Sequence, residues 1–231
     1  MSIPKSILAT ALLLASASAA QAAVVDGTIY EQIGGPTHVK GTTIDFYTIN
    51  LSADAILEVD MVASESLTGS LAAHPLALYD LNGDGEYTVM DGHMRLFKNG
   101  VEVGVADDTS AYSNPGNING WQDGTLSSRD SYMLLSLSAG GYTLAVADFN
   151  LQAADILTKF NTGDTLGNGQ THADYRLSIL AFDDFELDGN NNPLYGNEVA
   201  VSVSQVPVPA AAWLFGSAMM GFGAISRRKR A

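Results

Sequence analysis

The sequence predicts an all-β fold, an antiparallel β-sandwich with an N-terminal signal helix before it and a C-terminal hydrophobic helix after it. Two observations predict the sandwich. Short runs in which every second residue is apolar recur along the chain, as in half-buried strands. Loops rich in Gly, Asn and Asp separate these runs, and many short strands joined by such loops are typical of a sandwich. Only positions 151–160 read as a short helix.

The expected strands are defined by their alternating apolar residues. Two turns are also visible, since Asn99-Gly100 is a hairpin signal and Gly140-Gly141 precedes a strand. We expect Leu144 in that strand to face the core. In chain order, the alternating sets are Tyr47, Ile49 and Leu51; Ala55, Leu57, Val59 and Met61; Leu76 and Leu78; Met94 and Leu96; Val101, Val103 and Val105; Met133, Leu135 and Leu137; Tyr142, Leu144 and Val146; Tyr175, Leu177 and Ile179; and Val199, Val201 and Val203.

Residues 1–22 have the layout of a secretory signal peptide. Lys5 supplies the positive charge, positions 7–14 are apolar, and Ala20-Gln21-Ala22 fits the small-residue site of a signal peptidase. Cleavage after Ala22 is the preferred reading, with Ala17-Ser18-Ala19 as the competing site. The body of the protein is therefore expected to cross the inner membrane.

Residues 206–231 combine three features in order. The motif Val206-Pro207-Val208-Pro209 leads into an apolar run at positions 210–225, and the basic run 227–230 follows. The apolar run is shorter than the roughly 20 residues that a full span requires. A basic cluster behind such a run favours insertion with the basic end in the cytoplasm.

This segment resembles the PEP-CTERM sorting domain of Gram-negative bacteria, in a form that reads VPxPAAxWLF. The commonest form has Glu between the prolines, where this chain has Val208. The resemblance implies recognition by an exosortase-type membrane peptidase, usually in bacteria that produce exopolysaccharide and biofilm. Insertion in the inner membrane would then be transient, and the mature form would be at the cell surface or extracellular. A plain C-terminal membrane anchor is the alternative.

The charge and composition of the body exclude several classes of function. The ends hold five of the 11 basic residues, whereas all 25 acidic residues lie between Asp26 and Glu198, so the body carries a net charge of about −19. Such a charge disfavours nucleic acid as a partner, because phosphates require a basic patch. The chain has no cysteine, which excludes disulfides, thiolate metal sites and a cysteine nucleophile.

Three strand segments add a second resemblance. Asp45, Tyr47 and Ile49 match DxYxI, positions 140–146 contain a GxYxLxV strand, and positions 174–179 match DYxLxI. In this order they resemble the bacterial pre-peptidase C-terminal domain. That family implies a jelly-roll-like sandwich that is not itself catalytic and often mediates binding or secretion. We expect the sandwich domain over 23–182 and an acidic or polar linker, with a last strand, over 183–205.

One motif in the body predicts a Ca²⁺ site. Counted from Asp80, oxygen ligands fall at positions 1, 3 and 5, Gly85 falls at position 6, and an Asp falls at position 12. This is the spacing of an EF-hand-like loop, in which alternate side chains converge on one ion. The flanking residues fit strands better than helices, and a turn without an ion is the alternative. The predicted ligands are Asp80, Asn82, Asp84, the backbone carbonyl of Glu86, Thr88 or a water in its place, and Asp91.

Catalytic motifs are absent from the sequence. The four histidines have no metal-binding spacing, and no G-x-S-x-G elbow occurs. The acidic stretch 183–190 lacks ligand spacing, and Trp121 in the loop 114–121 fits core or loop packing better than a sugar platform. We therefore expect a non-enzymatic exported surface or matrix protein. A carbohydrate-binding or adhesive module of the extracellular polysaccharide is the alternative, and a secreted hydrolase ranks third.

Overall fold

The computed structural model describes residues 23–34, 38–63, 65, 80–107, 130–189 and 193–206. Four of the sequence-based expectations lie outside these residues: the signal peptide, the strand at Leu76 and Leu78, the 114–121 loop, and the sorting segment from position 207 onward. No helix within the described residues is long and apolar enough to cross a membrane.

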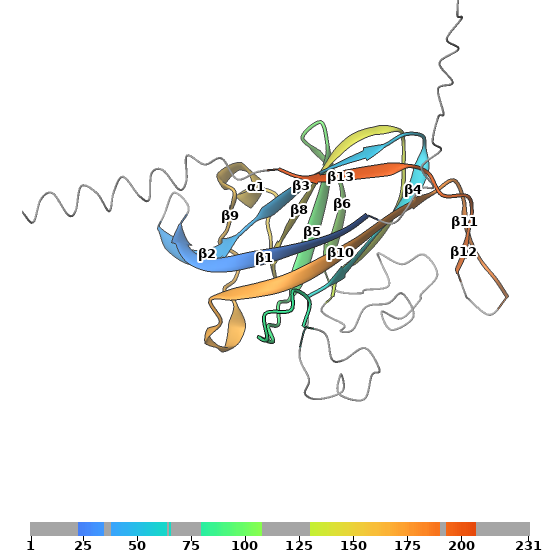
Figure 1. The fold of residues 1–231 in the computed structure, drawn as a ribbon. Helices are drawn as coiled ribbons and strands as arrows, with labels where there is room; N and C mark the ends of the chain where they lie inside the picture. The colour runs from blue at the N-terminus through green and yellow to red at the C-terminus, as the bar shows by residue number, and fades with distance from the viewer. Residues whose placement is uncertain are drawn as a thin grey trace, which may run out of the picture.

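Two antiparallel sheets form the molecule, so the predicted all-β sandwich-like architecture is confirmed (Figure 1). The six-stranded sheet has the order β7-β4-β10-β1-β2-β9, the five-stranded sheet has the order β13-β3-β8-β5-β6, and β11 and β12 form a separate hairpin. The strands are β1 (Ala23–Gly34), β2 (Val39–Thr43), β3 (Asp45–Leu51), β4 (Ala55–Val62), β5 (Gly92–Lys98), β6 (Val101–Asp107), β7 (Tyr132–Leu137), β8 (Gly140–Asp148), β9 (Phe160–Asn161), β10 (His172–Phe182), β11 (Phe185–Leu187), β12 (Pro193–Tyr195) and β13 (Val201–Gln205).

The core lies between the two sheets and is built from the alternating residues of the strands. Leu57 and Val59 enter it from β4, and Leu144 and Val146 enter it from β8, all with no exposed surface. The inward direction predicted for Leu144 is therefore confirmed. Burial of side chains of this size is the main source of stability in a chain without disulfides.

The central strand β8 is also covered on its outer face. Ala145 and Ala147 pack there with Ile44, Phe97 and Leu151 in a second buried cluster. Leu151 belongs to the segment that contains α1 (Asp155–Thr158), so the predicted short helix exists as one turn. Burial on both faces explains why β8 carries apolar residues at consecutive positions from 144 to 147.

The hairpin of β5 and β6 turns at Asn99 and Gly100, as predicted. Both residues have positive φ, 53° and 78°, which a two-residue hairpin turn of this kind requires. The valines of β6 nevertheless face solvent, and Val101 is 67% exposed. A register shift between Leu96 and Phe97 accompanies this arrangement, and Gly104 takes an inward position against Leu135.

The segment expected as a linker contains ordered strands. Its last strand, β13, pairs with β3 from Val201–Leu51 to Gln205–Tyr47 and forms an edge of the five-stranded sheet. The β11–β12 hairpin projects from the sandwich beside this edge (Figure 1). The expected last strand is thus present, and it belongs to the sandwich itself.

Candidate cation site

The loop that precedes β5 coils around the carboxylate of Asp80. Oδ1 of Asp80 accepts hydrogen bonds from the backbone N–H groups of Gly83 (2.5 Å) and Asp84 (3.1 Å), and Oδ2 accepts one from Gly85 (2.8 Å). Gly83 and Gly85 have φ of 77° and 84°, a conformation that side chains disfavour. The two glycines therefore let the chain turn tightly around the first predicted ligand.

Asn82 and Asp84 close the same coil from the other side. The Asn82 Nδ2 group donates to Asp84 Oδ2 (2.9 Å), and the Glu86 N–H donates to Asp84 Oδ1 (2.8 Å). The hydrogen bond from the Glu86 backbone, followed by that from Asn82, lowers the pKa of Asp84 below its usual value. Asp84 is therefore held as a carboxylate in a defined position, as a cation ligand must be.

Counting lone pairs shows what the coil can still bind. Each carboxylate oxygen accepts about two hydrogen bonds. The hydrogen bonds within the coil use both sites on Asp80 Oδ1 but leave one site on its Oδ2 and one on each oxygen of Asp84. Asn82 Oδ1 accepts the Asp84 N–H (3.0 Å) and keeps one further site. Side-chain oxygens of all three residues thus retain capacity for a hard cation.

Thr88, the predicted ligand at position 9, is engaged elsewhere. Its hydroxyl donates to Oε2 of Glu65 (2.7 Å) and accepts the N–H of Asp174 (2.8 Å). Glu65 is 1% exposed and also accepts the N–H groups of Thr88 (2.8 Å) and Leu81 (2.7 Å). Glu65 thus ties the two ends of the loop to the segment that follows β4, and the Thr88 hydroxyl is bound to Glu65 and Asp174.

Asp91, the predicted ligand at position 12, lies at the start of β5. Its backbone N–H donates to Oδ1 of Asp148 (3.2 Å), a side chain that is 4% exposed. Burial raises the pKa of Asp148 to about 6. Among the described residues, one group of acidic and histidine side chains has ligand atoms that all lie within 4.8 Å of one another. Asp91 is not part of this group.

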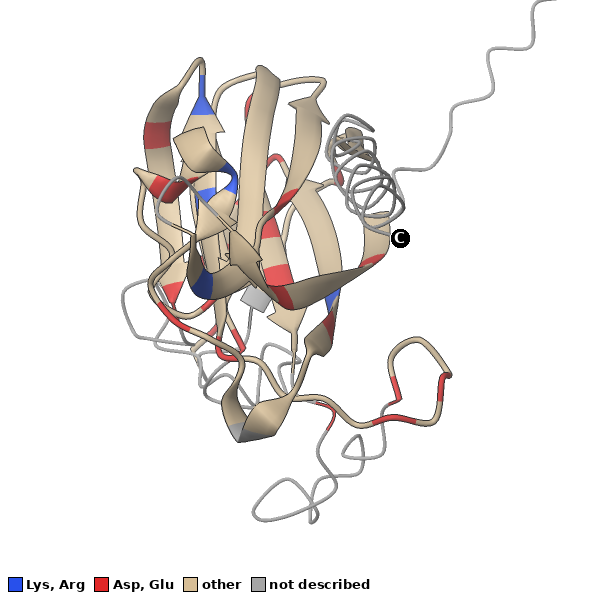
Figure 2. Ribbon diagram, turned by 90° about the vertical axis from the view of Figure 1, so that its left-hand side faces the viewer, with Lys and Arg blue, Asp and Glu red and all other residues tan. Residues whose placement is uncertain are grey.

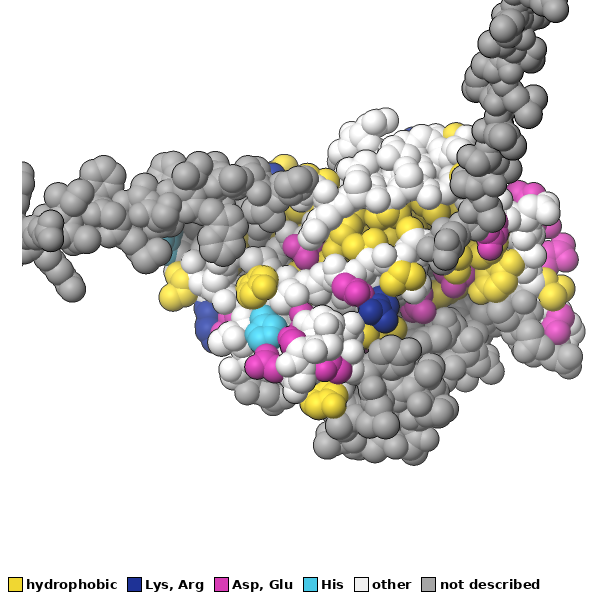
Figure 3. All heavy atoms as spheres, viewed as in Figure 1, with side chains coloured by type: hydrophobic (Ala, Val, Ile, Leu, Met, Phe, Trp, Pro, Cys, Tyr) yellow, Lys and Arg dark blue, Asp and Glu magenta, His cyan; other side chains and the backbone are white. Residues whose placement is uncertain are grey.

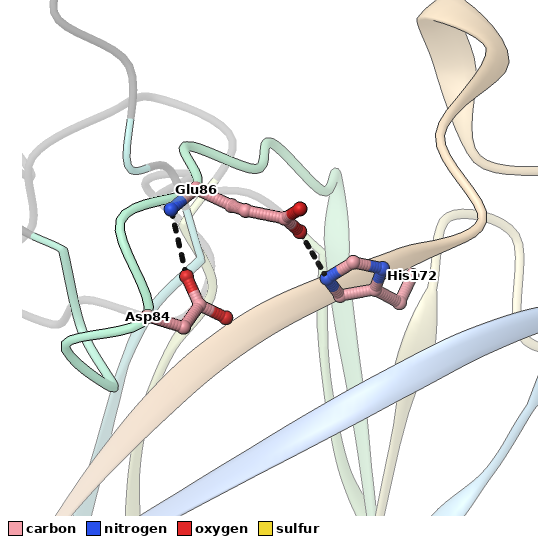
Figure 4. Close-up of side chains that lie close together, drawn as sticks. All are labelled: Asp84, Glu86 and His172. Atoms are coloured by element: carbon pink, nitrogen blue, oxygen red, sulfur yellow. Dashed lines mark hydrogen bonds and ion pairs between the residues drawn. The ribbon is translucent and has the colours of Figure 1, made fainter.

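That group consists of Asp84, Glu86 and His172 (Figure 4). The side chain of Glu86 turns toward β10, where its Oε2 lies 3.1 Å from Nε2 of His172. Acidic side chains surround a histidine on this face of the molecule (Figure 3). The structure therefore adds His172 and the Glu86 carboxylate to the loop residues that the spacing singled out.

Sequence reasoning missed the residues that frame this loop. The Gln170 side chain donates to the Val89 carbonyl (2.9 Å), and Arg176 donates to the Leu81 carbonyl (3.0 Å). With Glu65 and His172, these residues fix the loop against the six-stranded sheet. They are scattered in sequence, so no local pattern marks them. Only the alternation of Tyr175, Leu177 and Ile179 indicated that this strand passes through the core.

The first residue of the predicted sorting motif lies directly at the sandwich. The Val206 N–H donates to the carbonyl of Phe46 in β3 (2.7 Å), one residue beyond the end of β13. Pro207, Val208 and Pro209 lie outside the described residues.

Acidic positions outnumber basic ones along the ribbon (Figure 2), in accord with the charge of the sequence.

The comparisons with known proteins give no family for this chain. No family model matches it, and neither a curated protein nor a solved structure matches it.

Proposed function

We propose that this protein is a non-enzymatic exported protein of the cell surface or extracellular matrix, whose β-sandwich is stabilised by Ca²⁺. The observation that carries the proposal is the coil at 80–86, in which Asp80, Asn82 and Asp84 turn their oxygens inward at the predicted positions. The body has no cysteine, and an ion that joins successive residues of one loop supplies a cross-link of another kind.

The Ca²⁺ proposal differs in one respect from the EF-hand pattern, because position 12 holds Asp91 where that pattern has a bidentate Glu. Asp80, Asn82 and Asp84 supply side-chain oxygens, and Glu86 supplies its carbonyl, while water takes position 9 because Thr88 is bound to Glu65. Asp91 at position 12 would approach from the start of β5. A site with few charged ligands and several waters binds Ca²⁺ weakly, in the range of about 10⁻⁴–10⁻³ M that is typical of extracellular modules.

The Ca²⁺ proposal is tested by calorimetry and thermal unfolding. We expect about one Ca²⁺ to bind and to raise the melting temperature, since a ligand selective for the folded state stabilises it. Asp80→Ala combined with Asp84→Ala is expected to abolish both effects. Asp54→Ala combined with Asp164→Ala is the matched control, because it removes the same charge from exposed positions outside the coil. Absence of binding at millimolar Ca²⁺ would refute the proposal.

The second part of the proposal concerns sorting. We propose that signal peptidase removes residues 1–22, and that residues 206–231 hold the protein transiently in the inner membrane until an exosortase-type peptidase cuts near Pro207–Pro209. Since β13 ends at Gln205, such a cut leaves every strand of the sandwich intact. Mass spectrometry of the mature protein from its host tests this proposal. Recovery of a chain that still ends at Ala231 in the surface fraction would leave a plain membrane anchor instead.

One observation favours carbohydrate binding as a second function. At the base of the β11–β12 hairpin, the ring of Tyr195 stacks 4.4 Å from that of Phe182 and lies 5.6 Å from that of Phe185, and Tyr195 is 43% exposed. The exposed ring of Tyr195 offers an apolar face, and its hydroxyl offers a polar partner, to a sugar. A glycan array with the wild type and Tyr195→Ala tests this function, which requires binding that the variant loses.

A further inference from the structure

The group at Asp84, Glu86 and His172 contains a ligand that Ca²⁺ does not use. Ca²⁺ is bound by oxygen, whereas imidazole nitrogen suits Zn²⁺ and similar transition metal ions. The Glu86 carboxylate is also surplus to the Ca²⁺ loop, which requires only the carbonyl of that residue. Two side chains of the group are therefore unexplained by the predicted site, and they point toward each other with Asp84 close by (Figure 4).

We propose that Asp84, Glu86 and His172 form a surface site for a divalent transition metal ion, best suited to Zn²⁺. The site shares Asp84 with the proposed Ca²⁺ coil, but it does not depend on Ca²⁺ binding there. Its ligands come from two elements that are far apart in sequence, the loop before β5 and the first residue of β10. An ion bound to all three would connect the loop to the six-stranded sheet.

The spacing of the ligand atoms supports this assignment. Zn²⁺ binds nitrogen and oxygen ligands at about 2.0–2.2 Å, so two neighbouring ligand atoms of one ion are separated by about 3.0–3.5 Å. Glu86 Oε2 and His172 Nε2 are 3.1 Å apart, within that range. All three ligand atoms lie within 4.8 Å of one another. Asp84 is exposed, and its carboxylate supplies the third of these atoms.

The second ring nitrogen of His172 has the neighbour that a metal ligand requires. Nδ1 of His172 lies 3.4 Å from the hydroxyl oxygen of Thr171. A metal-bound imidazole nearly always donates its other N–H to an oxygen, which fixes the tautomer and leaves the first nitrogen available to the ion. With an ion bound, a proton on Nδ1 would leave the Nε2 lone pair to the ion, whereas without an ion Nε2 pairs with Glu86 Oε2 at 3.1 Å. Asp84 is held in turn by Asn82 and by the Glu86 backbone.

Access and charge also suit an ion taken from solution. Asp84 and Glu86 are exposed and His172 is half-buried, so an ion reaches the group directly and water completes its coordination. The strongly acidic body raises the local concentration of cations. A site with three protein ligands of this kind binds and releases its ion reversibly.

Titration of the full-length protein, purified without a histidine tag, tests the proposal with ZnCl₂ and separately with CaCl₂. We expect His172→Gln to weaken Zn²⁺ binding at least about tenfold and to leave Ca²⁺ binding unchanged. Glu86→Gln should likewise weaken Zn²⁺ binding, since it removes the carboxylate but keeps the backbone carbonyl. The matched control is His38→Gln, which removes an exposed imidazole outside the group. Far-ultraviolet circular dichroism checks that each variant is folded.

A second readout identifies the ligand directly. In protein labelled at its four histidines, Zn²⁺ should shift the imidazole resonances of one residue, and that residue is His172 if its signals are missing from His172→Gln. Unchanged Zn²⁺ affinity in His172→Gln, or a Zn²⁺-induced shift of another histidine alone, would overturn the proposal. Zn²⁺ binding that depends on His172 in a protein that binds no Ca²⁺ would uphold this site and refute the Ca²⁺ proposal, so the two outcomes are distinguishable.

Discussion

Removing the Glu65 side chain is expected to destabilise the protein although no sequence motif marks this residue. In Glu65→Ala, the N–H groups of Leu81 and Thr88 and the Thr88 hydroxyl lose their acceptor. A buried donor left unsatisfied costs about 1–3 kcal/mol. The hydroxyl can rotate to another partner, so the two amides dominate the cost. Because the neighbouring positions 82–87 are exposed and admit water, we expect a total of about 2–4 kcal/mol.

Urea denaturation with and without Ca²⁺ measures this effect. With a slope of about 1–3 kcal/mol per molar urea, the midpoint should fall by about 1–2 M. Glu65→Gln keeps one acceptor oxygen and should lose a smaller part of the stability. Glu198→Ala is the matched control, since its side chain is exposed and its loss should change stability by less than about 0.5 kcal/mol. If Glu65→Ala is no less stable than Glu198→Ala, Glu65 does not anchor the loop.

Two further predictions concern the sandwich. In thermal unfolding, Leu144→Ala should lower the free energy of unfolding by about 2–5 kcal/mol, because Leu144 has no exposed surface. Leu157→Ala is the control and should be almost neutral, because Leu157 is 88% exposed. Equal effects of the two substitutions would contradict the assigned core. Asp148→Asn should gain stability relative to the wild type as the pH rises from about 4 to 7. Burial raises the folded-state pKa of Asp148 from 3.8 to about 6, so between these pH values the folded wild type binds a proton that the unfolded chain does not. The wild type therefore loses stability as the pH rises and this proton leaves, whereas Asp148→Asn does not. A stability difference between the two proteins that does not change with pH would refute this reasoning.

The strands were predictable because their signal is local. Successive side chains of a strand point to opposite faces, so an alternating run such as Leu57 and Val59 marks the buried face within a few residues. The Asn99-Gly100 turn is predictable for the same reason. The direction of Val101 and its neighbours was not, since it depends on a register shift between β5 and β6 that no single strand encodes.

The candidate site divides in the same way. Asp80, Asn82 and Asp84 were predictable from spacing, because a short loop brings its own alternate residues together. His172 and Glu65 were not, because β10 brings His172 to the loop and the segment after β4 brings Glu65 there. A cluster formed by distant segments leaves no periodic trace in a single sequence, and an isolated histidine looks the same whether it binds a metal or not.

The way the loop is held indicates how cation binding would act on the whole molecule. Its ends are tied to the segment after β4 through Glu65, and its last residues are paired with Ala63, since the Met90 N–H donates to the Ala63 carbonyl (2.9 Å). On the other side, the N–H of Asp174 in β10 donates to the Thr88 hydroxyl (2.8 Å).

Because β4 and β10 are neighbours in the six-stranded sheet while β5 lies in the five-stranded sheet, the loop connects both layers. An ion that orders the exposed turn would therefore reduce fraying of a segment that joins the two sheets. Its effect should appear in global unfolding, and hydrogen exchange should slow at β4 and β10 as well as at positions 82–87. Slower exchange confined to positions 82–87 would show instead that the coil binds its ion without stabilising the sandwich.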